Sequence, residues 1–119
     1  MQLTTRRATS SDAAAVAELY LRARRAGSAK GTIPALVHDD DDVRYWVAHV
    51  VIPRFECWLA ECVSGQVVGI LVLQGDWIDQ LYVDPDLTGA GIGAELIAVA
   101  KRRRPDGLQL WTFVSNEGA

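Results

Sequence analysis

Residues 78–98 read IDQLYVDPDLTGAGIGAELIA, and this stretch decides the fold of the chain. Its first part, Ile78 to Val83, mixes aromatic and aliphatic side chains over the length of a strand. Asp84-Pro85-Asp86 supplies turn-forming residues, and a glycine-rich loop then leads into the helix-forming run from Ala94 to Ala98. The stretch therefore predicts a strand, a turn, a glycine loop and an amphipathic helix.

The glycine loop carries the strongest functional signal. Gly89, Gly91 and Gly93 stand at alternate positions where the helix should begin. Glycines let a ligand approach the backbone, and the free N–H groups of a first helical turn favour an anion. A loop that contains glycine only for its turn is the structural alternative. Three glycines at a helix entry favour a phosphate or pyrophosphate site.

Two common phosphate-binding motifs do not match this loop. A dinucleotide fingerprint needs a third glycine where Ala94 or Leu96 stands. A nucleoside triphosphate loop ends in Gly-Lys-Ser/Thr, whereas Ala94 and Glu95 follow Gly93. If the loop binds an anion, it therefore belongs to a class other than these two.

The loop resembles that of the GNAT superfamily of acyl-CoA-dependent N-acetyltransferases. The family signature is Gln/Arg-x-x-Gly-x-Gly/Ala after a strand ending in Val-x-Pro, and Val83-Asp84-Pro85 matches the strand end. Gly91 and Gly93 match the two glycines, whereas Thr88 replaces the usual arginine or glutamine. The resemblance implies an α/β (α+β) fold, with a mixed, mostly antiparallel sheet, a central parallel β-α-β unit and flanking helices. It also implies acetyl-CoA as cosubstrate.

Composition limits the alternatives. The chain has 119 residues, of which 50% are hydrophobic and 23% charged, so we expect one globular domain over residues 1–119. A net charge of −3 gives no global attraction for nucleic acid, so a nucleic-acid site would have to rest on Lys101 to Arg104. No run approaches the ~20 apolar residues of a membrane span, and the start lacks the apolar segment of a signal peptide. We expect a cytoplasmic protein with no membrane partner.

The first half of the chain predicts a strand and two helices. Leu3 to Arg7 suits an edge strand, and several N-cap residues from Thr9 to Asp12 precede a helix that Gly27 should end. Ala26 to His38 has an irregular composition. A second helix should follow Asp39 to Asp42 and end near Ile52-Pro53. The four aspartates either cap this helix, which we favour, or attract a cationic amine.

The second half predicts a hairpin and a β-α-β unit. Glu56 to Val63 and Gln66 to Leu73 form strand-like runs joined at Ser64-Gly65. Cys57 and Cys62 lie at odd spacing, which would place them on opposite faces of a strand and argues against a disulfide or a metal site. Lys101 to Arg104 should close the last helix, and Leu108 to Val114 should add a parallel strand.

The resemblance also implies site residues. The cofactor-binding set combines the strand end, the glycine loop and one asparagine: Leu81, Tyr82, Val83, Thr88, Gly89, Ala90, Gly91, Ile92, Gly93, Ala94 and Asn116. The strand residues would act through their backbone. Asp79 is the first candidate for the catalytic base, Asp76 the second and Glu61 the third, although a solvated aspartate is the plain alternative for Asp79. The acceptor would be a primary amine of a small molecule or a protein.

The chain ends at Ala119, where family members continue with a helix that carries a tyrosine acid and two more strands. We therefore expect either an incomplete acetyltransferase domain or a homo-oligomer that covers the edge of the Leu108 to Val114 strand. Two functions follow: an N-acetyltransferase, or a catalytically inactive acyl-CoA-binding or interaction module. A nucleic-acid-binding module that uses Lys101 to Arg104 ranks last, and we expect no nucleic-acid partner. Thr88 and the missing tyrosine favour the second function.

Overall fold

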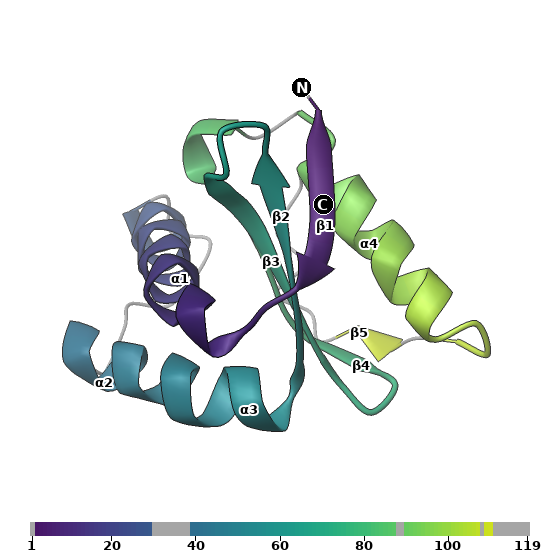
Figure 1. Cartoon of the computed structure of the whole chain (residues 1–119), viewed down its shortest axis with the longest axis horizontal. Helices are drawn as coiled ribbons and strands as arrows, with labels where there is room; N and C mark the ends of the chain where they lie inside the picture. The colour runs from purple at the N-terminus through teal and green to yellow at the C-terminus, as the bar shows by residue number, and fades with distance from the viewer. Residues whose placement is uncertain (1, 30–38, 88–89, 108, 111–119) are drawn as a thin grey trace.

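The computed structural model describes residues 2–29, 39–87, 90–107 and 109–110 (Figure 1). These residues form a five-stranded sheet in the order β1-β2-β3-β4-β5. The first three pairings are antiparallel and the β4–β5 pairing is parallel, which confirms the predicted mixed, mostly antiparallel sheet. The strands are β1 Leu3–Arg7, β2 Glu56–Cys62, β3 Val67–Gln74, β4 Trp77–Val83 and β5 Gln109–Leu110. The main helices are α1 Ala13–Ala29, α2 Asp40–Trp46, α3 Ile52–Arg54 and α4 Ile92–Arg103.

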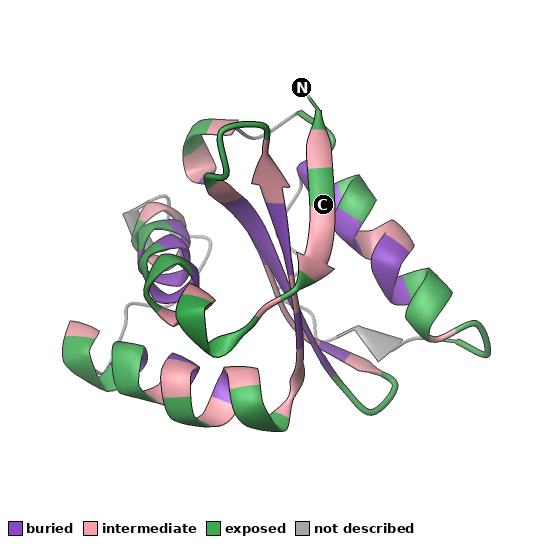
Figure 2. Cartoon of the chain, viewed as in Figure 1, coloured by how far each residue is buried: buried purple, intermediate pink, exposed green. Residues whose placement is uncertain are grey.

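Helices cover both faces of the sheet. In Figure 1, α1, α2 and α3 lie on one side, and α4 lies on the other. Each side has its own apolar core, one containing Leu19 and Ile70 and the other containing Leu71 and Leu96 (Figure 2). Because β3 is covered on both faces, its run from Val68 to Leu73 is buried throughout.

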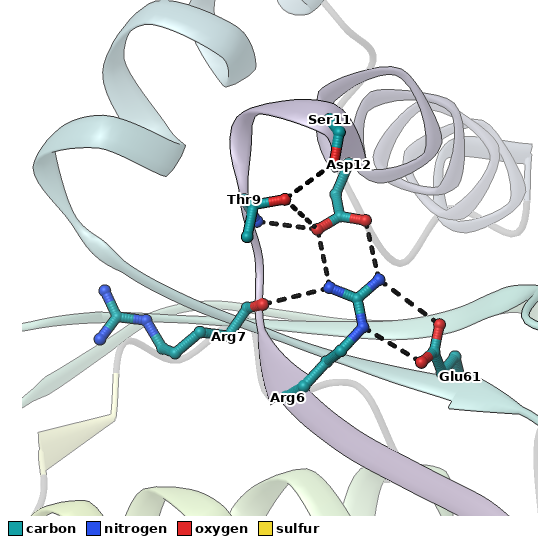
Figure 3. A network of polar contacts seen from close by, with 6 residues as sticks. All are labelled: Arg6, Arg7, Thr9, Ser11, Asp12 and Glu61. Atoms are coloured by element: carbon teal, nitrogen blue, oxygen red, sulfur yellow. Dashed lines mark hydrogen bonds and ion pairs between the residues drawn. The ribbon is translucent and has the colours of Figure 1, made fainter.

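A polar network fixes the entry into α1 (Figure 3). The backbone N–H of Thr9 donates to Asp12 at 2.7 Å, and Arg6 donates to both oxygens of the same carboxylate at 2.8 and 2.9 Å. These bonds, that of Arg6 first, hold the pKa of Asp12 well below its usual range. The predicted N-cap region is confirmed, but the predicted end at Gly27 is wrong. The helix continues to Ala29, since a glycine can also occupy a helical position at modest cost.

The second helical segment contains a π-helical turn, η2 Val47–Val51, between α2 and α3. The Asp39 side chain accepts the backbone N–H of Asp42 at 2.8 Å, as an N-cap does. Asp40 pairs with Arg25, and Asp41 pairs with Arg44 at 3.1 Å. These contacts support the capping interpretation over attraction of an amine. The segment ends at Arg54, close to the predicted end.

The predicted hairpin is confirmed, with β2 and β3 joined by a turn in which Gly65 has φ +87°. Cys57 packs in the core beside α1, whereas Cys62 packs against the core beside α4. Both thiols are free. The predicted placement on opposite faces is therefore confirmed. Within the described part of the chain, no helix is long and apolar enough to cross a bilayer.

Candidate functional site

The loop after β4 begins at a buried carboxylate. Asp84 is 2% exposed, and its side chain accepts the N–H of Asp86 at 2.9 Å and a hydrogen bond from Arg22 of α1 at 2.7 Å. Its own N–H donates to Val68 of β3 at 2.8 Å. The 3-10 turn η3 Pro85–Leu87 follows. The predicted turn is thus confirmed, and its first residue is tied to both β3 and α1.

The helix after the loop begins without a side-chain cap. Gly91 is the N-cap residue, with φ +81° and ψ 9°, a left-handed conformation that favours glycine. Gly91 supplies no side-chain cap to the first turn, and the N–H of Glu95 donates to the Gly91 carbonyl at 3.0 Å. The N–H groups before Glu95 have no intrahelical acceptor. They form a donor cluster at the positive end of α4, which suits an anion.

Gly69 of β3 brings this helix end close to the sheet. A Cβ atom at Gly69 would lie 2.7 Å from Ile92 Cγ2 and 2.8 Å from Leu96 Cδ1, both well inside van der Waals contact. Gly69 is also paired with Val83, the last residue of β4. The absence of a side chain at Gly69 therefore sets the spacing between the end of β4 and the first turn of α4. Sequence reasoning treated Gly69 as an ordinary strand residue and missed this role.

A β-bulge in β4 lies just before that end. Gln80 is paired with Val72 and Ile78 with Leu73, so Asp79 has no opposite residue in β3. Ile78 and Leu81 accordingly contact the same α4-side core although they are three positions apart. Asp79 is half-buried and interacts electrostatically with Tyr20 of α1. The bulge therefore places this carboxylate near the α1 side of the sheet.

Aromatic side chains meet on the α1 side of β4. The Tyr20 ring lies edge-on to Trp46 and to Tyr82, with centroid distances of 5.5 and 5.1 Å. Burial, followed by the neighbouring Tyr82, raises the pKa of Tyr20 to about 12. Arg24 lies over the Tyr20 ring at 5.9 Å and donates to the Tyr82 hydroxyl at 3.3 Å. This cluster contacts the stretch of β4 that the sequence assigned to acyl binding.

Asp76 lies at the other end of β4. It is exposed in the turn between β3 and β4, next to Gly75, whose carbonyl accepts a hydrogen bond from Arg104. Arg103 and Arg104 also pair with Glu56, at 2.6 and 3.1 Å. The basic run that closes α4 therefore stabilises the fold at the end opposite the glycine loop.

Several predicted residues lie outside the described part of the chain. These are Thr88, Gly89, Asn116 and all of the Leu108 to Val114 strand except Gln109 and Leu110. Of the other predicted residues, Leu81 and Val83 of β4 pack in the same core as Ile92 in the first turn of α4, whereas the side chain of Tyr82 packs in the core beside α1. Glu61, the third candidate base, pairs instead with Arg6 at 3.1 Å on the far side of β3 (Figure 3).

Comparison with known families gives a direct assignment. A family model described as the acetyltransferase (GNAT) domain matches residues 53–119, more than half of the chain. The chain belongs to this family. The match includes β4, the loop and α4, so the GNAT resemblance of the sequence is confirmed.

Curated relatives match over shorter lengths. Peptidyl-lysine N-acetyltransferase YjaB of Escherichia coli is 34% identical over 55 residues, which cover 46% of this chain and 37% of the relative. An uncharacterized N-acetyltransferase of Methanocaldococcus jannaschii is 32% identical over 90 residues, or 62% of this chain and 40% of the relative. The matched region of this GNAT chain thus spans less than half the length of either relative.

Solved structures support the GNAT fold. The apo form of YjaB from Escherichia coli superposes with a TM-score of 0.70 at 24% identity, covering 88% of this chain and 68% of that one. An N-acetyltransferase from Thermoplasma acidophilum, solved in complex with coenzyme A, gives 0.65 at 15% identity, covering 89% and 74%. At these identities the likeness shows the fold alone.

Proposed function

We propose that this GNAT chain transfers an acetyl group from acetyl-CoA to a primary amine. The observation that carries the proposal is the start of α4 at Gly91, which has no side-chain cap, follows the bulged strand β4 after the loop that contains η3, and packs in the same core as the end of β4. The first turn of α4, which follows the left-handed Gly91, offers the N–H groups of Ile92, Gly93 and Ala94 to a pyrophosphate. Thr88, Gly89 and Ala90 complete the proposed loop, and Asn116 is a further proposed contact.

In this proposal β4 holds the thioester. Leu81, Tyr82 and Val83 supply backbone groups, and a backbone N–H donates to the thioester carbonyl as negative charge develops on its oxygen. Their side chains pack in the two cores: Leu81 and Val83 contact the core beside α4, and Tyr82 lies in the core beside α1. Backbone recognition leaves that packing intact.

Transfer requires that the amine lose a proton before its nitrogen attacks, and that the leaving sulfur gain one. We propose Asp79 as the base, because the bulge places its half-buried carboxylate on the strand beside the proposed thioester site. Asp76 is the weaker candidate, since it lies in the turn at the opposite end of β4 from Gly91. Asp79→Asn should lower the rate of thiol release about a hundredfold, whereas Asp76→Asn should leave it within a few fold.

Calorimetry with acetyl-CoA tests the cofactor assignment, and thiol release across a panel of amines tests transfer. We expect saturable binding and amine-dependent release. No binding at millimolar acetyl-CoA would refute the proposal. Binding without release for any amine would instead select the second candidate, an inactive acyl-CoA-binding module, which the replacement at Thr88 favours. Homo-oligomerisation through the Leu108 to Val114 strand remains a prediction, and a monomer in gel filtration would contradict it.

A further inference from the structure

Arg24 is half-buried, and no described carboxylate forms an ion pair with it. Among the described residues, its buried Nε atom has no hydrogen-bond partner, whereas Nη1 donates to the Tyr82 hydroxyl at 3.3 Å. Across the described ranges, no carboxylate pairs with it. A buried polar group left in this state costs free energy, so it requires an explanation.

The other arginines make this state unusual. Among the described residues, three arginines are half-buried: Arg6, Arg24 and Arg104. Arg6 pairs with Asp12 and Glu61, and Arg104 pairs with Glu56. Even the exposed Arg22 and Arg25 on the same helix have aspartate partners. The chain thus supplies a carboxylate to its other half-buried arginines but leaves Arg24 for a partner that is not part of the described chain.

The position of Arg24 indicates what that partner is. Arg24 lies over the Tyr20 ring at 5.9 Å, and Asp79, the proposed base, interacts electrostatically with the same tyrosine. One cation and one anion therefore act on the same tyrosine, whose ring packs against Tyr82 of β4. An amine that also carries a carboxylate has the complementary pair of charges, with its ammonium group suited to Asp79 and its carboxylate to the guanidinium.

We propose that Arg24 binds the carboxylate of the acceptor, so that the acceptor is a small amino acid rather than a plain alkylamine or a polyamine. This inference rests on the proposed acetyltransferase function for its choice of acceptor. Arg24 is then the residue that selects the substrate, and its contacts with Tyr20 and Tyr82 hold the guanidinium in place. The aspartates from Asp39 to Asp42 are not needed for recognition, in agreement with their capping and ion-pair contacts.

A binding experiment on the full chain tests the proposal. Glycine, β-alanine and γ-aminobutyrate are titrated by calorimetry, each beside its own amide, which keeps the amine but removes the negative charge. We expect at least one acid to bind about tenfold or more tightly than its amide. Arg24→Gln should abolish that preference without changing the affinity for the amide, and Arg24→Lys should retain part of it. Arg25→Gln is the matched control, because Arg25 is the next residue on α1, is exposed, and pairs with Asp40.

Equal binding of acids and amides to the wild type, no binding of any acid, or an unchanged preference in Arg24→Gln would each overturn the proposal. Acetyl-CoA titrated into the same variants separates the two hypotheses. If acetyl-CoA binds and the acid preference is absent, the inference about Arg24 fails and the acetyltransferase proposal stands. If acetyl-CoA does not bind but Arg24 still selects acids, the acetyltransferase proposal fails and carboxylate recognition by Arg24 stands.

Discussion

Arg22 Nη2 lies 2.7 Å from Asp84 Oδ2, and this ion pair joins α1 to the start of the loop that leads into α4. The Asp84 side chain is 2% exposed and that of Arg22 is 43% exposed. The same carboxylate accepts the N–H of Asp86 through its other oxygen. The buried Asp84 thus links the loop before α4 to α1, the helix that covers the opposite face of the sheet (Figure 1).

Arg22→Gln should destabilise the protein by about 2 kcal/mol, because it leaves the buried carboxylate of Asp84 without its charged partner. Chemical denaturation measures the loss. Arg44→Gln is the control, since Arg44 and Glu18 are 44% and 54% exposed and such pairs contribute at most about 1 kcal/mol. Equal losses in the two variants would contradict a special role for Asp84.

Gly69→Ala should cost about 2 kcal/mol of unfolding free energy, because the added Cβ would overlap Ile92 and Leu96. A side-chain rotation can move Cδ1 of Leu96 away from the added Cβ. Cγ2 of Ile92 is attached to a branched Cβ, so it can move away only if the helix shifts. In urea denaturation, the double variant Gly69→Ala/Leu96→Ala should lose less than the sum of the two single losses, since part of the overlap is relieved. Strict additivity would show that the two sites do not touch.

Glu56 should make stability depend on pH under acid conditions. Burial acts to raise its pKa, but hydrogen bonds from Arg103, Trp58 and Arg104 outweigh burial and lower the pKa from 4.5 to about 2. A carboxylate whose pKa is lowered by folding stabilises the folded protein at any pH above its unfolded-state pKa. This stabilisation is lost as the pH falls from about 4.5 towards 2.

Glu56→Gln should therefore be less stable than the wild type by about 2 kcal/mol at pH 7, and the difference should shrink below pH 4.5. Thermal unfolding of both proteins across this range measures it. Glu18→Gln, which removes an exposed partner of Arg44, should show a small difference at every pH. A Glu56→Gln deficit that stays constant down to pH 2 would contradict the assignment.

The two cysteines should react at very different rates. Cys57 is 1% exposed, and burial raises the pKa of its thiol to about 11. Cys62 is half-buried, and a hydrogen bond with Ser64 lowers the pKa of its thiol. Mass spectrometry after iodoacetamide treatment at pH 8 should find Cys62 modified and Cys57 protected. In denaturant both should react equally, and rapid native modification of Cys57 would contradict its burial.

Local sequence signals predicted most of the fold. The apolar strand pattern and the turn residues placed β1, the β2–β3 hairpin, β4 and the glycine entry to α4 correctly, because each signal acts over a few neighbouring residues. Gly27 shows the limit of such signals. Glycine often ends a helix, but here α1 continues through Gly27 to Ala29.

The features of the site that the sequence did not predict depend on contacts between segments far apart in the chain. Arg22 and Asp84 are 62 positions apart, and the sequence showed Arg22 only as one of several basic residues near the end of a helix. Gly69 and Arg24 gain their roles from α4 and β4, which no local pattern places beside them. The bulge at Asp79 arises from pairing with β3 and likewise has no signature within β4.

Acetyl-CoA titrations of Gly91→Ala and Gly75→Ala test the central claim most directly. Both glycines have positive φ, +81° and +60°, and a Cβ atom would meet nothing within 4 Å at either position. Both variants should therefore lose about 1 kcal/mol of stability through backbone strain alone. Gly91 begins α4, whereas Gly75 lies in the turn at the other end of β4. We expect Gly91→Ala to weaken acetyl-CoA binding at least tenfold and Gly75→Ala to leave it unchanged. Equal affinity in both variants would contradict a cofactor site at the start of α4.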